Sequence, residues 1–213
     1  MASSSERGAA RAREAPPPPL PPPPPKEVAA FYALVEKRVT AGVLYRHARC
    51  AELSGRAARH AQQRLWGDNS LEVADLRVFE TNALRGMALA STSSSEKEAL
   101  RRRAWAILVP VHALLLRRLA DNTLLPGTNT EEEVTYYARS QAITFKAKEE
   151  TVPSEAVLRG FGIVLGYRIL LDAVFQTLNL LMVLRGFSLL RESAHSFVLT
   201  ALDAISRTAT MQD

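Results

Sequence analysis

The chain has 213 residues, 47% of them hydrophobic, and a formal net charge of +5 at pH 7. This mild charge, with acidic and basic residues interspersed, does not indicate a nucleic-acid-binding protein. The single cysteine, Cys50, excludes an intramolecular disulfide and nothing indicates an oxidising compartment, so we expect a cytoplasmic protein, with the nucleus as the alternative.

Residues 1–25 are predicted to form a disordered arm rich in serine, arginine and proline. Prolines flank Leu20 in a run with fixed φ angles and almost no amide donors, which favours an extended polyproline II conformation. The prolines of this run are Pro16, Pro17, Pro18, Pro19, Pro21, Pro22, Pro23, Pro24 and Pro25. The run is either a stiff spacer or a ligand for profilin, SH3 or WW domains.

From Lys26 onward the composition changes, and residues 26–213 are predicted to form a single all-helical domain. A first helix is indicated by apolar side chains at helical spacing, namely Phe31, Leu34, Val35 and Val39. A second helix is expected over 43–66, with Tyr45 and Ala48 among its inward-facing residues and its arginines facing solvent.

Capping residues set the next boundaries. Ser70 is expected to cap a third helix that ends near 91–95. Ser95 and Glu98 have capping-box spacing and predict a fourth helix over 96–119, which Pro110 should kink or divide. Thr130 and Glu133 form a second candidate capping box, before a fifth helix over 131–149.

Residues 155–185 are apolar on nearly every face, so we expect one central helix there, the most buried of the domain. Arg168 and Asp172 lie one turn apart in this segment, as a local ion pair or as a pair that binds a ligand. Gly186 fits a left-handed helix end, and a final helix is expected over 194–209.

These elements predict an all-α fold in which antiparallel helical hairpins stack as a short array or as an irregular helical bundle. The segment 65–74 resembles the loop between consecutive repeats of kinesin-light-chain-type tetratricopeptide proteins, with Ala57 and Ala61 at the small helix-contact positions. The spacing of a tetratricopeptide first helix is reproduced by Leu158, Phe161, Gly162 and Leu165. The resemblance implies a concave helical surface that binds peptides.

No catalytic, cofactor or metal-binding motif was found. The four histidines lie in separate segments without ligand spacing, and no glycine-rich phosphate loop follows a strand. An enzyme would have to assemble a site from scattered polar residues such as Glu80, Asn82, His112 and Asp172. The uncharged apolar stretches 104–116 and 173–184 are shorter than the roughly 20 residues of a bilayer-spanning helix, so no transmembrane segment is expected.

We therefore expect a non-enzymatic scaffold or adaptor without cofactors that binds a peptide or a partner helix. Its expected partner-binding residues are Arg56, Arg59, Trp66, Arg101, Arg102 and Arg103. The arginines would bind acidic side chains or a terminal carboxylate through forked hydrogen bonds. The alternative is a membrane-peripheral protein that binds anionic lipid through the basic helix 96–119.

Overall fold

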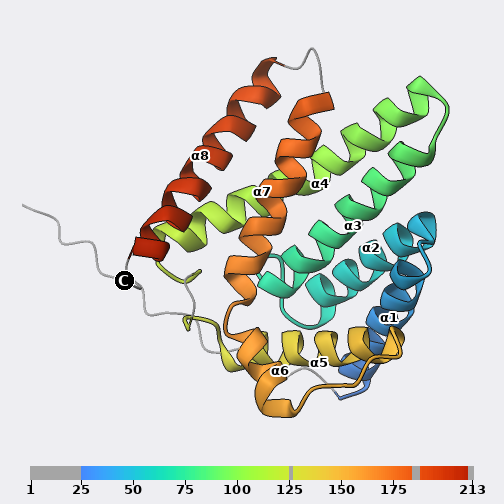
Figure 1. The fold of residues 1–213 in the computed structure, drawn as a ribbon, viewed down its shortest axis with the longest axis vertical. Coiled ribbons are helices and arrows are strands. Elements are labelled where there is room, and N and C mark those ends of the chain that lie inside the picture. Colours follow the sequence, from blue (N-terminus) through green and yellow to red (C-terminus); the bar gives the residue numbers. More distant parts are fainter. Residues whose placement is uncertain (1–24, 125–126, 184–187, 211–213) are drawn as a thin grey trace, which may run out of the picture.

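The computed structural model describes residues 25–124, 127–183 and 188–210. The described residues form helices and no strand, which confirms the predicted all-α class (Figure 1). In chain order the helices are α1 (Pro25–Val43), α2 (His47–Arg64), α3 (Leu71–Ala90), α4 (Ser94–Ala120), α5 (Glu131–Ala147), α6 (Glu155–Gly162), α7 (Leu165–Val183) and α8 (Ser188–Thr210).

Helices α1 to α4 pack each against the next, as expected of consecutive helices with short connections. Helix α5 returns to pack on α1 and α6 instead of extending this series, while α7 packs on α3, α4 and α8 (Figure 1). All of these helices except α6 contribute to one contiguous apolar cluster. Within the described residues, every helix is too short or too polar to cross a lipid bilayer.

The capping signals were partly correct. The Glu133 amide donates to Thr130 Oγ1 at 3.2 Å and the Thr130 amide to Glu133 Oε2 at 2.9 Å, which confirms the capping box of α5. Ser70 also caps α3 as predicted, by accepting a hydrogen bond from the Val73 amide.

The capping box expected at Ser95 and Glu98 is wrong. Helix α4 begins at Ser94, and its cap is Ser93, whose Oγ accepts from the Glu96 amide at 3.3 Å. The serine run offers the same spacing two residues earlier, and a 2.6 Å hydrogen bond from Ser91 Oγ to the Glu96 carboxylate stabilises that earlier start.

Helix α4 continues through Pro110, so of the two predicted alternatives, a kink or a division into two segments, the division is wrong. Proline removes one helical hydrogen bond and crowds the carbonyl of the residue four positions earlier. Pro110 and Ala106 are both exposed, so that carbonyl lies on the solvent side, where water can satisfy it.

Two boundaries near the start of the domain also differ. Pro25 is the first residue of α1, where a missing amide hydrogen costs nothing, so the polyproline interpretation cannot include it. The chain turns between α1 and α2, and Tyr45 in this turn has a φ of +53° and is 80% exposed. Ala48 is exposed as well, so the inward orientation expected for both residues is wrong.

The single helix expected over 155–185 is instead two helices, α6 and α7. Gly162 ends α6 against α5, where an added Cβ would lie 2.7 Å from the Val134 carbonyl oxygen. The tetratricopeptide-like positions 158–165 are therefore divided between two helices. Neither of these two helices is the most buried of the domain, because α3 is more buried and α7 keeps an exposed apolar face.

Residues 1–24 of the arm and Gly186 lie outside the described residues.

Candidate functional site

A cavity of about 740 Å³ lies between α1, α2, α3, α5 and α7. Its charged lining side chains are Arg38, Lys148 and Arg168, and Phe79 and Tyr137 contribute aromatic surface. No carboxylate is among the described side chains that line it. Its volume falls within the range of small-molecule sites, so this cavity is the first candidate for a binding site.

Arg38 is the most unusual side chain of the cavity. It is 4% exposed, and its Nε has no hydrogen-bond partner among the described residues. Its guanidinium lies 4.0 Å from the centre of the Phe79 ring, a contact that partly offsets the loss of hydration. A guanidinium stays charged in proteins, so this is a buried cation without an acceptor at Nε.

Arg168 reaches the cavity from α7. It donates a 2.7 Å hydrogen bond to the Tyr137 hydroxyl, and its Nε lies 3.5 Å from Asp172 Oδ2. The predicted pairing of Arg168 with Asp172 is thus confirmed, and Arg168 also lines a cavity. Burial raises the pKa of Tyr137 although Arg168 opposes the rise, so the hydroxyl stays protonated and can accept from Arg168 while donating elsewhere.

A buried polar pair lies close to the cavity. Tyr136 is fully buried and donates a 2.8 Å hydrogen bond to Asp75 Oδ2. Burial, with the Asp75 charge, holds the pKa of Tyr136 well above its usual value, so Tyr136 remains a donor. Cys50, which lines the cavity, is buried, and desolvation raises the pKa of its thiol. Among the described residues no group of three His, Cys, Asp or Glu side chains is placed to hold a metal ion.

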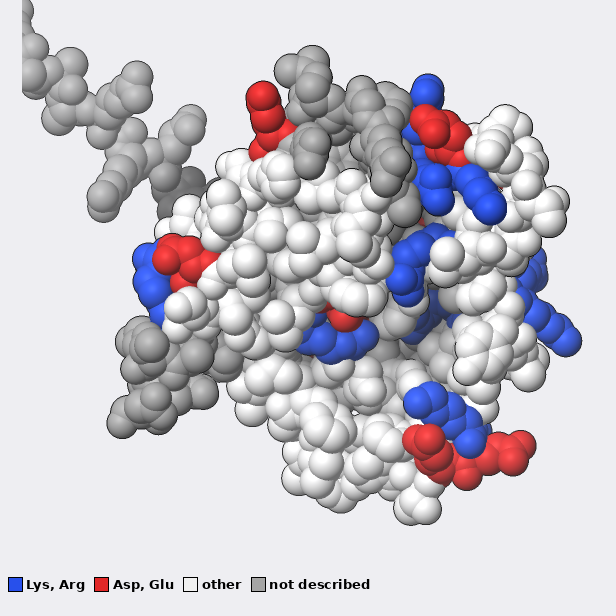
Figure 2. Space-filling model, turned by 45° about the horizontal axis from the view of Figure 1, so that its top comes forward, with Lys and Arg blue, Asp and Glu red and all other residues white. Residues whose placement is uncertain are grey.

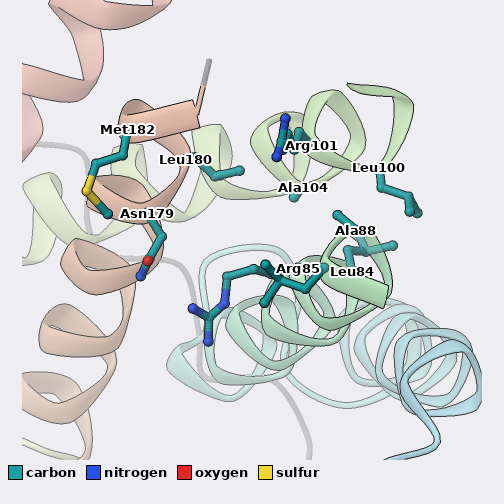
Figure 3. A pocket seen from close by; sticks show the side chains of 10 residues that line it. Leu84, Arg85, Ala88, Leu100, Arg101, Ala104, Asn179, Leu180 and Met182 are labelled. Carbon is teal, nitrogen blue, oxygen red and sulfur yellow. The ribbon is translucent and has the colours of Figure 1, made fainter. Parts of the chain in front are cut away.

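A second hollow of about 110 Å³ lies between α3, α4 and α7 (Figure 3). Its lining is mainly apolar and comprises Leu84, Ala88, Leu89, Leu100, Ala104, Leu180 and Met182, with Arg85, Arg101 and Asn179. Figure 3 shows Leu180 pointing from α7 toward α4, while Arg85 extends from α3 toward α7. We call this hollow the α3–α4–α7 groove.

The groove continues onto an exposed apolar face of α7. Phe175, Leu178 and Met182 are exposed large hydrophobic residues of this helix. Leu199 and Leu202 are exposed on the neighbouring α8. Figure 2 shows that charged side chains are sparse over this part of the surface. Extended apolar surface of this kind is typical of a contact site for another molecule.

The structure separates the three arginines predicted to bind a partner. Arg102 pairs with Glu98, and Arg103 reaches Glu80 on α3 at 3.0 Å. Arg101 lines the α3–α4–α7 groove and forms no ion pair with any described residue. Of the three, Arg101 is therefore the one whose charge remains available beside a hollow.

The remaining predicted residues lie elsewhere. Arg56 is exposed on α2 and lies 3.6 Å from Glu52, and Arg59 is exposed on the same helix. Trp66 follows α2, and its ring makes edge contacts with Phe31 and Tyr136. The structure does not bring these residues together with Arg101, and their partner-binding role stays a prediction.

The four residues considered for an enzyme site have separate surroundings. Glu80 is buried between Arg77 and Arg103, and Asn82 accepts a hydrogen bond from Gln176. His112 is hydrogen-bonded to Thr177 at 2.8 Å, and burial lowers its pKa to about 4. Asp172 pairs with Arg168, and of the four residues only Asn82 lines the cavity of about 740 Å³.

The sequence patterns did not identify Arg38 and Lys148 as residues of a site. Arg38 follows Phe31 and Val35 at helical spacing and therefore lies on the apolar stripe of α1, which was the signal that could have identified it. A cation on such a stripe must be paired, solvated or functional. Lys148 follows α5 in an ordinary charged helix end, which gave no comparable signal.

We compared the chain with protein-family models, with curated proteins and with solved structures. No family model, no curated protein and no solved structure matches it. The resemblance of 65–74 to tetratricopeptide proteins thus stays a prediction.

Proposed function

We propose that this chain is a non-enzymatic helical adaptor that binds an amphipathic partner helix in the α3–α4–α7 groove. The observation that supports this function is the row of exposed apolar residues that continues the groove along α7, namely Leu171, Phe175, Leu178 and Met182. Their spacing of four, three and four residues is that of a heptad seam, which packs against the apolar stripe of another helix.

Charge at the groove favours an acidic partner. Arg85 and Arg101 lie among the lining side chains, and no carboxylate does among the described ones. Arg85 also stacks over Phe175, with its guanidinium carbon 5.4 Å from the ring centre. Glutamates or aspartates beside the apolar stripe of the partner would meet these two arginines, which orients the helix and speeds its association.

The apolar contacts supply the affinity. Leu89 and Met182 are 72% and 71% exposed at the groove, so a partner helix would remove much of their surface from water. Full burial of a side chain of this size is worth about 1.5–3 kcal/mol. The hollow between them has room for an apolar anchor of the partner.

A displayed library of helical peptides, panned on the full chain, tests the proposal. We expect selected peptides to carry apolar residues at helical spacing and acidic residues beside them. Met182→Glu and Arg101→Glu should each weaken binding by about tenfold or more, because one places a charge in the apolar contact and the other repels the acidic flank. Affinity measured by fluorescence polarisation gives the comparison.

Val157→Glu is the matched control, since Val157 is 48% exposed on α6 and does not line the groove. It should leave peptide affinity unchanged. Selected peptides that bind Met182→Glu and Arg101→Glu as tightly as the unmodified chain would contradict the proposed groove.

Co-sedimentation with phosphatidylserine vesicles at low salt separates this proposal from the membrane-peripheral alternative. That alternative uses the basic helix 96–119, yet within it Arg102, Arg103 and Arg118 pair with carboxylates of the chain. We expect no retention on the vesicles.

The adaptor would act in the cytoplasm or nucleus, and recruitment of polyproline-binding domains by the arm remains part of the proposal.

A further inference from the structure

A buried, unsatisfied cation is the starting observation for a second site, independent of the proposed adaptor groove. Arg38 is 4% exposed in the wall of the 740 Å³ cavity, and its Nε lacks a hydrogen-bond partner among the described residues. Removing an arginine from water without a counterion costs several kcal/mol in order-of-magnitude terms. An anion that enters the cavity would supply the counterion that Arg38 lacks among the described residues.

Two further cations face the same cavity. Arg168 lies over the same aromatic ring as Arg38, with its guanidinium carbon 5.6 Å from the centre of Phe79. Lys148 lines the wall from the end of α5 and is exposed. Two guanidinium groups at one ring and an ammonium group at the wall make a positively charged binding site.

The carboxylates near the cavity do not cancel this charge. Asp75 accepts a hydrogen bond from Tyr136, and its charge, like that of Asp172, favours the charged form of Arg168, but Asp75 is absent from the cavity lining. Asp172 offsets part of the Arg168 charge at 3.5 Å, and it too is absent from the lining. Arg38 and Lys148 have no ion pair with any described residue, so about two positive charges remain for a ligand.

We propose that this cavity binds an organic phosphate monoester. A phosphate monoester carries a charge of about −1.5 to −2 at pH 7 and presents three acceptor oxygens, which matches two uncompensated cations better than a single carboxylate does. Arginine forks bind phosphate through paired hydrogen bonds. The cavity is much larger than a phosphate group, and Phe79, Val39 and Asn82 line the remaining space, so the ligand has an organic body.

Calorimetric titration of the full chain with phenyl phosphate, inorganic phosphate and benzoate tests the ligand class. Phenyl phosphate places the dianion at the arginines and its ring against the apolar wall, so we expect it to bind at least about tenfold more tightly than the other two. Benzoate binding as tightly as phenyl phosphate would overturn phosphate recognition. Equal affinity of inorganic phosphate would overturn the organic body, and no binding of phenyl phosphate at millimolar concentration would overturn the site.

Arg38→Met tests the residue that defines the site. We expect phenyl phosphate affinity to fall by about 10- to 100-fold, the usual cost of losing hydrogen bonds from a charged group. Without ligand, the melting temperature should stay the same or rise, because the substitution removes a buried cation that lacks an acceptor at Nε. Unchanged phenyl phosphate affinity in a folded Arg38→Met would overturn the proposal.

Lys148→Met provides a second test at an exposed position that the fold tolerates. We expect roughly threefold to tenfold weaker binding, since an exposed ammonium contributes less than a buried fork. Lys37→Met is the matched control, because Lys37 is exposed on α1 and does not line the cavity. Equal losses in Lys37→Met and Lys148→Met would show a general charge effect and overturn the assignment.

Discussion

Helix α3 is more buried than helix α7, although α7 is the more apolar of the two. Helix α3 carries Glu72, Asp75 and Glu80, yet each of these carboxylates is buried and so is most of the helix. Helix α7 is far more apolar, yet Phe175 and Met182 are exposed on it. Apolar content therefore does not identify the central helix of this fold, because burial depends on how extensively the neighbouring helices cover a helix.

The neighbours of the two helices explain the difference. Helix α3 packs against α2, α4, α5 and α7, so even its polar positions are covered. Two of the three covered carboxylates have partners: Tyr136 donates to Asp75, and Arg77 and Arg103 pair with Glu80. Helix α7 also has four neighbours, α3, α4, α5 and α8, but it packs on them less extensively and keeps an exposed apolar face. Surplus apolar surface of this kind is where a partner is expected.

The largest loss of stability is expected when the hydrogen bond between Tyr136 of α5 and Asp75 of α3 is removed. Tyr136→Ala should lower the free energy of unfolding by about 3–5 kcal/mol, because it empties a fully buried site and leaves Asp75 without its donor. Urea denaturation followed by circular dichroism measures the change. Tyr136→Phe keeps the ring and should cost only about 1–3 kcal/mol, and equal losses in the two variants would contradict a packing contribution.

Most of the helices that make these contacts were predicted from the sequence. Regular spacing and side-chain caps located the helices, and Thr130 with Glu133 and Ser70 identified two helix starts correctly. The break after Gly162 was not predictable, because it depends on close approach to Val134, a contact between different helices. The cavity was missed for the same reason: Arg38 and Arg168 lie far apart in sequence and meet only at Phe79.

A carboxylate buried on α3 should make stability depend on pH. Burial raises the pKa of Glu72 to about 7 from an ordinary value of 4.5, and Glu133 adds to the rise. As the pH increases through this window the unfolded chain ionises first, so the native state loses stability, and the penalty is complete above the raised value. Glu72→Gln removes the penalty and should raise the free energy of unfolding by roughly 2–3 kcal/mol at about pH 8, with little difference near pH 4.

Urea denaturation at several pH values measures this effect. Glu132→Gln is the matched control, since Glu132 is an exposed residue in the first turn of α5. The control should change stability by less than about 0.5 kcal/mol at every pH. A gain for Glu72→Gln that is as large at the acidic end as at the alkaline end would show that ionisation is not its cause.

The glycine at the end of α6 helps to determine where α7 begins. Gly162→Ala should cost about 1–3 kcal/mol, because its Cβ would lie 2.7 Å from the Val134 carbonyl oxygen of α5. Gly160→Ala on the same helix has no atom within 4 Å of the added Cβ and should be neutral or stabilising. Thermal denaturation of both variants checks the difference. Similar effects would contradict close packing of α6 on α5.

The smallest effect is expected on the exposed face of α7, where two adjacent leucines give a matched pair. Leu171 is 43% exposed and Leu170 is 1% exposed. Leu171→Ala should therefore lower the free energy of unfolding by less than about 1 kcal/mol, whereas Leu170→Ala should lower it by about 2–5 kcal/mol. Both are measured by urea denaturation at two protein concentrations. A loss in Leu171→Ala that matches Leu170→Ala and grows with concentration would mean that a second copy covers this face, because only association makes the stability of an exposed residue depend on concentration.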